Sequence, residues 1–229
     1  MIINYLLPFI YKYKDYRFLL KLRYILLNRI NGNFIANKKT TICIEGFPRS
    51  ANSYFVRLFK FSNPHHNIAH HTHSLANIKY SLNNKIPIVC LIREPADAIA
   101  SYCIYSKINN INYALKSYIH FYQFIQKNKT NMIIAEFSKV IANSADIIKK
   151  IRLVYGNNFS LLDNEVEISG KVKDDIDNKY SKDELRKYQN TRKPLPNNKR
   201  NKEKESLMIL IRKDKLYQNS LNIFNDLNS

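Results

Sequence analysis

The chain has 229 residues, enough to bury the core of one domain, and 45% of them are hydrophobic, as in a globular protein. It contains only four glycines and seven prolines, which excludes collagen-like and other low-complexity classes. Basic residues outnumber acidic ones by 37 to 18, and the resulting net charge of +19 predicts anionic partners: nucleotides, acidic polymers, nucleic acid or an anionic membrane.

Residues 1–38 are a basic segment that we expect to pack as a helix on the rest of the chain. Residues 1–11 are apolar but too few to span a membrane, and no cleavage signal follows them. Residues 18–30 have a basic amphipathic pattern, for which peripheral membrane contact is the alternative to packing on the domain. We also expect the three cysteines to be reduced core residues. These features together predict a cytoplasmic protein, with a membrane-peripheral one as the alternative.

Residues 40–61 predict a buried strand, a tight loop and a helix. The strand is β-branched and apolar, and aromatic and aliphatic residues then recur at helical spacing from Tyr54 to Phe61. Between them lies the sequence Gly46, Phe47, Pro48, Arg49, Ser50, Ala51, Asn52 and Ser53. The N–H groups of a helix start beside an arginine favour phosphate or sulfate. The loop is not a Walker A motif, because Ala51 and Asn52 stand where Gly-Lys is required.

A cluster of histidines follows this helix. His65, His66, His70, His71 and His73 lie within nine residues, and residues 67–69 could form a short strand that brings the last three to a strand end. Such ends face the ligand crevice in open α/β sheets. Zinc binding is one interpretation, although neither a cysteine nor a carboxylate lies nearby. Solvated loop histidines are another.

Residues 86–92 predict a second buried strand, which ends at Arg93. A helix then begins with Pro95 in its first turn and runs to Tyr105, and acidic residues stand near its start. Ser101 lies slightly more than two turns along, on the side that can face the strand end. This arrangement is a candidate second phosphate site. The alternative is a local ion pair between Arg93 and Asp97.

The rest of the chain continues the strand–helix alternation. We expect a packing helix at 111–126, a third strand at 132–135 and a helix at 139–155, which predicts parallel βαβ units. Residues 165–201 are polar and predict a lid or a solvated surface, and residues 202–227 predict a covering amphipathic helix. Basic residues in or near the polar region could contact an anionic cofactor or acceptor: Arg192, Lys193, Lys199 and Arg200.

Three of these stretches resemble the sulfotransferases that use 3′-phosphoadenosine 5′-phosphosulfate (PAPS). The loop from Pro48 to Tyr54 is similar to their 5′-phosphosulfate loop, except that Ala51 replaces the usual glycine. Arg93, Asp97 and Ser101 fit a second family pattern, whose Arg and Ser hold the 3′-phosphate. The pair Thr72-His73 resembles the element that carries the family's catalytic base.

The resemblance implies a three-layer α/β/α fold with a central, mainly parallel sheet, similar to P-loop NTPases, over residues 39–229. It implies transfer of a sulfuryl group from PAPS to a hydroxyl or amine of a carbohydrate or small metabolite, without a metal and without nucleic acid as partner. His73, or else His71, would be the base, and Arg49 would stabilise charge on the leaving phosphate. The implied cofactor-binding residues are Pro48, Arg49, Ser50, Ala51, Asn52, Ser53, Arg93 and Ser101.

Two other classes stay open. A phosphotransferase that uses ATP would share the strand–loop–helix cradle, but it would need a loop lysine and carboxylates for magnesium. A basic nucleic-acid-binding protein would explain the charge of +19, but not two phosphate motifs at strand ends.

Overall fold

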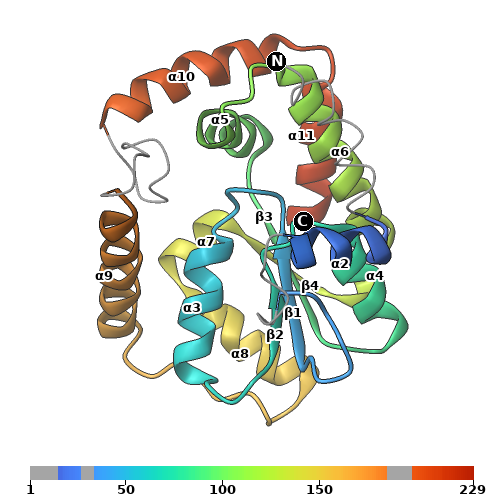
Figure 1. Cartoon of the computed structure of the whole chain (residues 1–229), viewed down its shortest axis with the longest axis vertical. Coiled ribbons are helices and arrows are strands. Elements are labelled where there is room, and N and C mark those ends of the chain that lie inside the picture. Colours follow the sequence, from blue (N-terminus) through green and yellow to red (C-terminus); the bar gives the residue numbers. More distant parts are fainter. Residues whose placement is uncertain (1–14, 27–33, 185–197) are drawn as a thin grey trace.

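A computed structural model describes residues 15–26, 34–184 and 198–229 (Figure 1). In these ranges four parallel strands form one sheet in the order β2-β1-β3-β4. Their bounds are β1 Ile42–Gly46, β2 Ile68–His70, β3 Ile88–Ile92 and β4 Ile133–Glu136. The register places Ile44 beside His70 and Gly46 beside Leu91, so the carboxyl ends of the three strands that precede the predicted motifs lie at one edge.

Helices cover both faces of the sheet, which gives the expected three-layer α/β/α architecture (Figure 1). On one face lie α3 Asn52–Ser62, α7 Phe137–Ala142, α8 Ser144–Tyr155 and α9 Glu165–Glu184. On the other lie α4 Leu75–Asn83, α5 Pro95–Ser106, α6 Ile111–Lys127, α10 Asn198–Lys213 and α11 Tyr217–Asn228. A 3₁₀ turn, η1 Lys129–Asn131, precedes β4. Helix α2, Arg17–Leu26, packs against α4.

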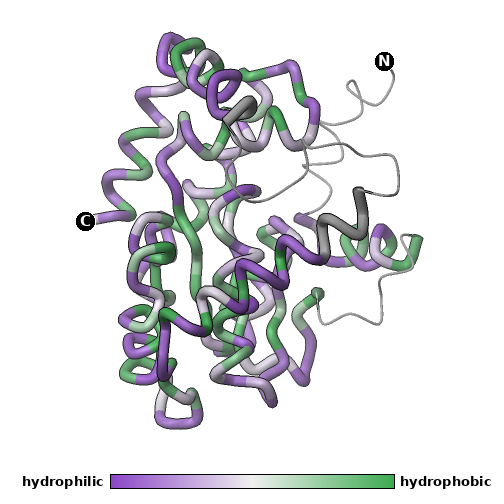
Figure 2. The backbone as a smooth tube through the Cα atoms, turned by 90° about the vertical axis from the view of Figure 1, so that its left-hand side faces the viewer, coloured by the Kyte–Doolittle hydropathy of each residue, from purple (hydrophilic) through white to green (hydrophobic). Residues whose placement is uncertain are grey.

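The two cores arise from the alternation of side chains along the strands. In β1, Cys43 faces the core under α5 and α6, whereas Ile42 and Ile44 face the core under α3 and α8. Both sets are fully buried, as the continuous apolar runs predict for a sheet covered on two sides. Cys43, Cys90 and Cys103 are buried and free, in agreement with the sequence analysis. The helices alternate between polar and apolar residues along their length (Figure 2).

Several helices differ from the expected ones. The stretch 139–155 is divided into α7 and α8, because the Asn143 side chain accepts a hydrogen bond from the Asp146 N–H and starts a new helix. The stretch 202–227 is likewise divided, at Asp214, whose carboxylate accepts from the Leu216 N–H.

The polar stretch 165–201 begins as a regular helix. Helix α9 packs beside α3, and its Val172 and Ile176 are buried there although its polar sequence shows little periodicity. Two apolar residues four apart are enough for one contact stripe. Residues 185–197, with Arg192 and Lys193, lie outside the described residues. The basic helix expected at 18–30 is described as α2 up to Leu26.

Within the described ranges, no helix combines the length and apolar character that crossing a bilayer requires.

We predict that Gly46→Ala destabilises the protein by about 1–3 kcal/mol, because β1 and β3 approach too closely for a side chain there. A Cβ on Gly46 would lie 2.5 Å from the backbone oxygen of Leu91, which is fixed in the sheet. Urea unfolding of both proteins measures the difference. Gly170→Ala in α9 is the control. Its Cβ would meet no atom within 4 Å, and we expect it to gain roughly 0.5–1 kcal/mol from helix propensity. Equal stability of the two variants would contradict the close-approach argument.

Candidate functional site

Three segments converge where β1, β2 and β3 end. The loop 47–51 leads from β1 into α3, the segment 71–74 leads from β2 into α4, and residues 93–94 lead from β3 into α5. Parallel strands bring their carboxyl ends to one edge, where ligands bind in open α/β sheets. The structure therefore brings together Arg49, His71, His73, Arg93 and Ser101, which the sequence analysis selected from separate stretches.

The loop after β1 has a strained backbone that a buried tyrosine supports. Arg49 and Ala51 have φ angles of 72° and 66°, in the left-handed region that costs a non-glycine residue roughly 1–2 kcal/mol. The hydroxyl of Tyr122, on α6, accepts from the Phe47 N–H at 3.2 Å and donates to the Leu91 carbonyl at 2.7 Å. It also lies 3.4 Å from Ser50 Oγ. Tyr122 thus ties the loop to the end of β3.

Helix α3 begins without a capping side chain. Its N-cap residue is Ala51, whereas a side chain from Ser74, Glu94, Asn110, Glu136 or Asn143 caps α4, α5, α6, α7 or α8 respectively. The N-terminal N–H groups of a helix carry partial positive charge and favour an anion. The start of α3 beside Arg49 therefore has the properties of an anion-binding turn.

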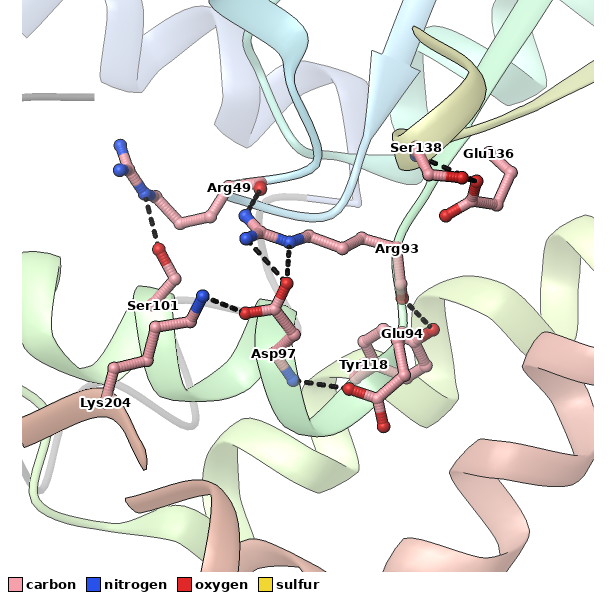
Figure 3. A network of polar contacts seen from close by, with 9 residues as sticks. All are labelled: Arg49, Arg93, Glu94, Asp97, Ser101, Tyr118, Glu136, Ser138 and Lys204. Atoms are coloured by element: carbon pink, nitrogen blue, oxygen red, sulfur yellow. Dashed lines mark hydrogen bonds and ion pairs between the residues drawn. The ribbon is translucent and has the colours of Figure 1, made fainter. Parts of the chain in front are cut away.

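Arg49 links this loop to α5. Its Nε donates to Ser101 Oγ at 3.1 Å, and its guanidinium lies 4.9 Å from the ring centre of Tyr105. Both contacts are with uncharged groups. The two predicted phosphate motifs are thus in direct contact through their side chains (Figure 3).

Arg93 is hydrogen-bonded to the backbone of the same loop (Figure 3). Its Nη1 donates to the Arg49 carbonyl at 2.7 Å, while its Nε and Nη2 both lie 2.6 Å from Asp97 Oδ2. The guanidinium is 3.8 Å from the ring centre of Phe137, and the Arg93 carbonyl accepts from Tyr118 Oη at 2.8 Å. The local pair of Arg93 with Asp97, considered as an alternative from the sequence, is therefore present in the structure.

Lys204, on α10, adds a further positive charge that the sequence analysis missed. Its Nζ contacts the second carboxylate oxygen of Asp97, so this one acid faces two cations. Nothing in the local sequence of α10 marks this lysine among its neighbours. The candidates Lys199 and Arg200 begin the same helix, but their side chains lie outside the described part of the structure.

The sequence analysis also missed Glu45, whose carboxylate accepts four hydrogen bonds at the site. Its carboxylate is fully buried at the end of β1 and accepts from the Thr72 N–H at 3.0 Å, the Thr72 hydroxyl at 2.6 Å, the His73 N–H at 3.0 Å and Asn77 Nδ2 at 2.9 Å. Burial raises the pKa of Glu45, although these hydrogen bonds act to lower it. A glutamate inside an apolar strand was the available signal, since buried acids need partners.

The segment held by Glu45 carries the two histidines considered as a base. His73 Nδ1 lies 2.8 Å from the Gly46 carbonyl, which can only accept, so Nδ1 carries a proton. His71 Nε2 lies 2.9 Å from Ser53 Oγ, in the first turn of α3. The other ring nitrogen of His71 is 2.5 Å from Nδ1 of His70. His71 and His73 have positive φ angles of 58° and 50°. His73 thus contacts the end of β1, whereas His71 contacts the first turn of α3.

The other histidines lie elsewhere. His66 Nδ1 is 3.1 Å from Thr41 Oγ1, before the start of β1, and its ring stacks on Phe159. His120 pairs with Asp15 at 2.8 Å. In residues 15–26, 34–184 and 198–229, no three His, Cys, Asp or Glu side chains are grouped so as to hold a metal ion.

No protein-family model matches the chain, and a sequence search of curated proteins finds no match.

We predict that His70 makes the protein sensitive to acid. Burial, and then the charges of Lys60 and Arg57, lower the pKa of His70 from 6.5 to about 4. As the pH falls from about 6.5 towards 4, the unfolded chain binds a proton that the folded state excludes, so stability decreases. The full loss from this group is on the order of 3 kcal/mol.

His70→Asn should reduce this dependence, because an amide can still hydrogen-bond near His71 but does not titrate. Urea unfolding at pH 7 and pH 5 gives the change in the free energy of unfolding for the wild type, for His70→Asn and for the exposed control His65→Asn. If this change is as large in His70→Asn as in the wild type, His70 is not the group that causes the acid sensitivity.

Proposed function

We propose that this chain is a PAPS-dependent sulfotransferase with a P-loop-like binding site, which transfers a sulfuryl group to a hydroxyl or amine. One observation carries the proposal: the two predicted anion motifs touch, through Arg49 Nε on Ser101 Oγ at 3.1 Å and through Arg93 on the Arg49 carbonyl at 2.7 Å. A ligand with anionic groups at two positions on one nucleoside needs two adjacent cationic subsites. A single-phosphate site would require only the first loop.

The residues at the site fit such a ligand. The uncapped start of α3, Ser53 and Arg49 would hold the 5′ phosphosulfate, because helix N–H groups and a guanidinium favour multiply charged oxygens. Arg93 and Ser101 would hold the 3′-phosphate, with Lys204 adding positive charge beside Asp97. When bound, PAPS supplies the sulfuryl group and a phosphate leaving group.

The histidine segment supports separate roles for its two candidate bases. With its proton on Nδ1, a neutral His73 has its lone pair on Nε2, the atom that can take a proton from an acceptor hydroxyl or amine. Glu45 fixes the backbone of His73, which keeps the ring in position. His71 instead contacts Ser53 of the donor loop. We therefore assign His73 as the general base and His71 to the donor side of the site.

The two alternative functions predict different ligands. An ATP-dependent phosphotransferase would bind ATP with magnesium, and a nucleic-acid-binding protein would bind duplex DNA with a steep dependence on salt. The sulfotransferase proposal predicts preference for adenosine 3′,5′-bisphosphate, the product that remains when PAPS has lost its sulfuryl group. Calorimetric titration of one preparation with all three ligands separates the three classes. Preference for ATP-magnesium or for DNA would overturn the proposal.

We predict that Arg49→Ala lowers the affinity for adenosine 3′,5′-bisphosphate by roughly ten- to a hundredfold, since a hydrogen bond to a charged group contributes about 1.5–3 kcal/mol. Arg152→Ala is the matched control. It removes the same charge from α8, where Arg152 donates to Asn157 Oδ1 at 3.2 Å. The control should bind almost as the wild type does. If both variants weaken the ligand equally, general charge and not the loop accounts for the binding.

We further predict that His73→Ala lowers kcat by roughly 10²–10⁴ while nucleotide affinity is largely retained, the usual effect of losing a general base. His71→Ala should mainly raise the KM for the donor, because His71 contacts the donor loop. Steady-state kinetics with saturating and limiting donor distinguishes these effects. The reverse pattern would make His71 the base.

A further inference from the structure

Helix α2 has an exposed apolar face that the proposed reaction does not use. The helix buries Leu20 and Tyr24 against Ala76 of α4 and the neighbouring Phe34. Its opposite face exposes four large apolar side chains: Phe18 (74%), Leu22 (41%), Ile25 (52%) and Leu26 (77%). The spacing 18, 22, 25 places them in one stripe along the helix. A row of large apolar side chains in water differs from the scattered ones of an ordinary surface.

Positive charge borders this stripe on both sides. Lys21 and Arg23 are exposed, and at 3.6 residues per turn they fall on opposite flanks of the apolar side chains. Helix α2 has no acidic residue. In the described residues 15–26, three residues are basic, and the one acid, Asp15, has a side chain that is 8% exposed and pairs with His120. The surface around the stripe therefore complements an anionic layer and not a basic or neutral partner.

The buried face of α2 is joined to the histidine segment of the candidate site. Tyr24 Oη donates to the His71 carbonyl at 3.4 Å, and Asp15, which precedes α2, accepts from the Leu75 N–H at 2.8 Å. Phe34 packs edge-on against the His70 ring at 5.1 Å between ring centres. Helix α2 thus contacts the segment that carries the candidate base, and it lies beside α4, the helix that follows this segment (Figure 1).

We propose that the apolar face of α2 docks on an anionic membrane surface, with Phe18, Leu22, Ile25 and Leu26 in the headgroup–acyl boundary and Lys21 and Arg23 against lipid phosphates. An interfacial helix of this kind combines apolar burial with electrostatic attraction, and both are present here. The docking stands without the proposed reaction. Where that reaction also holds, the acceptor is a hydroxyl or amine at the level of the lipid headgroups, because the histidine segment is fixed to the same helix.

Co-sedimentation with vesicles tests the docking without nucleotide or turnover, so its result is independent of the proposed function. We use phosphatidylcholine vesicles with and without phosphatidylglycerol. The wild type should bind the mixed vesicles and bind less as salt is raised, since screening weakens the attraction to anionic lipid. Leu26→Glu should weaken partition by roughly tenfold or more, the scale for losing one buried leucine.

Leu153→Glu is the matched control, because Leu153 on α8 has the same residue type and nearly the same exposure, 76%. It should bind as the wild type does. A second pair of variants tests the charge. Lys21→Glu on α2 should weaken vesicle binding, whereas its control Lys149→Glu on α8 should not. Circular dichroism confirms that each exposed substitution leaves the fold intact.

Two outcomes would overturn the proposal. If the α2 variants and the α8 control variants lose vesicle binding to the same extent, overall charge, and not this face, holds the protein on vesicles. Failure of the wild type to bind mixed vesicles would also overturn it. If sedimentation velocity then shows a dimer that Leu26→Glu dissociates, the face is an interface between two copies of the chain.

Discussion

The candidate site depends on the hydrogen bonds that the buried carboxylate of Glu45 accepts. A charge without water is stable only where donors surround it, and here the donors come from one short segment, Thr72–His73, and from Asn77 in the next helix. Satisfying the carboxylate therefore fixes the conformation of the segment between β2 and α4, including the positive φ of His73. The position of the candidate base is a consequence of the need to solvate an acid at the end of the neighbouring strand.

A second constraint fixes the other side of the edge. Arg93 donates to Asp97 and to the Arg49 carbonyl, so the residue that follows β3 holds a left-handed residue of the first loop. Tyr122 also holds this loop to the end of β3, because its hydroxyl accepts from the Phe47 N–H and donates to the Leu91 carbonyl. Rigid elements thus carry the strain of the loop, as expected where side chains must be held ready for a ligand.

The sequence predicted those parts that follow from local patterns. The apolar runs of β1 and β3 and the Pro95 start of α5 are periodic or positional signals, and the structure has them within about two residues. The bounds of α7 to α11 were less predictable, because Asn143 and Asp214 act through side-chain hydrogen bonds that a hydrophobic pattern does not contain. A glutamate inside an apolar strand indicates a buried acid that needs donors, but the partners of Glu45, Tyr122 and Lys204 could not be predicted, since each arises from contacts across 27 or more positions of sequence.

The hydrogen bond from Arg93 to the Arg49 carbonyl would couple the two proposed anion-binding subsites to each other. A group that binds at one end and shifts Arg93 changes the geometry of the loop at the other, and by linkage the second group must alter the first to the same extent. If the proposed nucleotide binds here, its two charged groups would bind more tightly, or less tightly, together than the sum of the separate groups. Selectivity at this edge of the sheet would then depend on cooperativity within a single ligand.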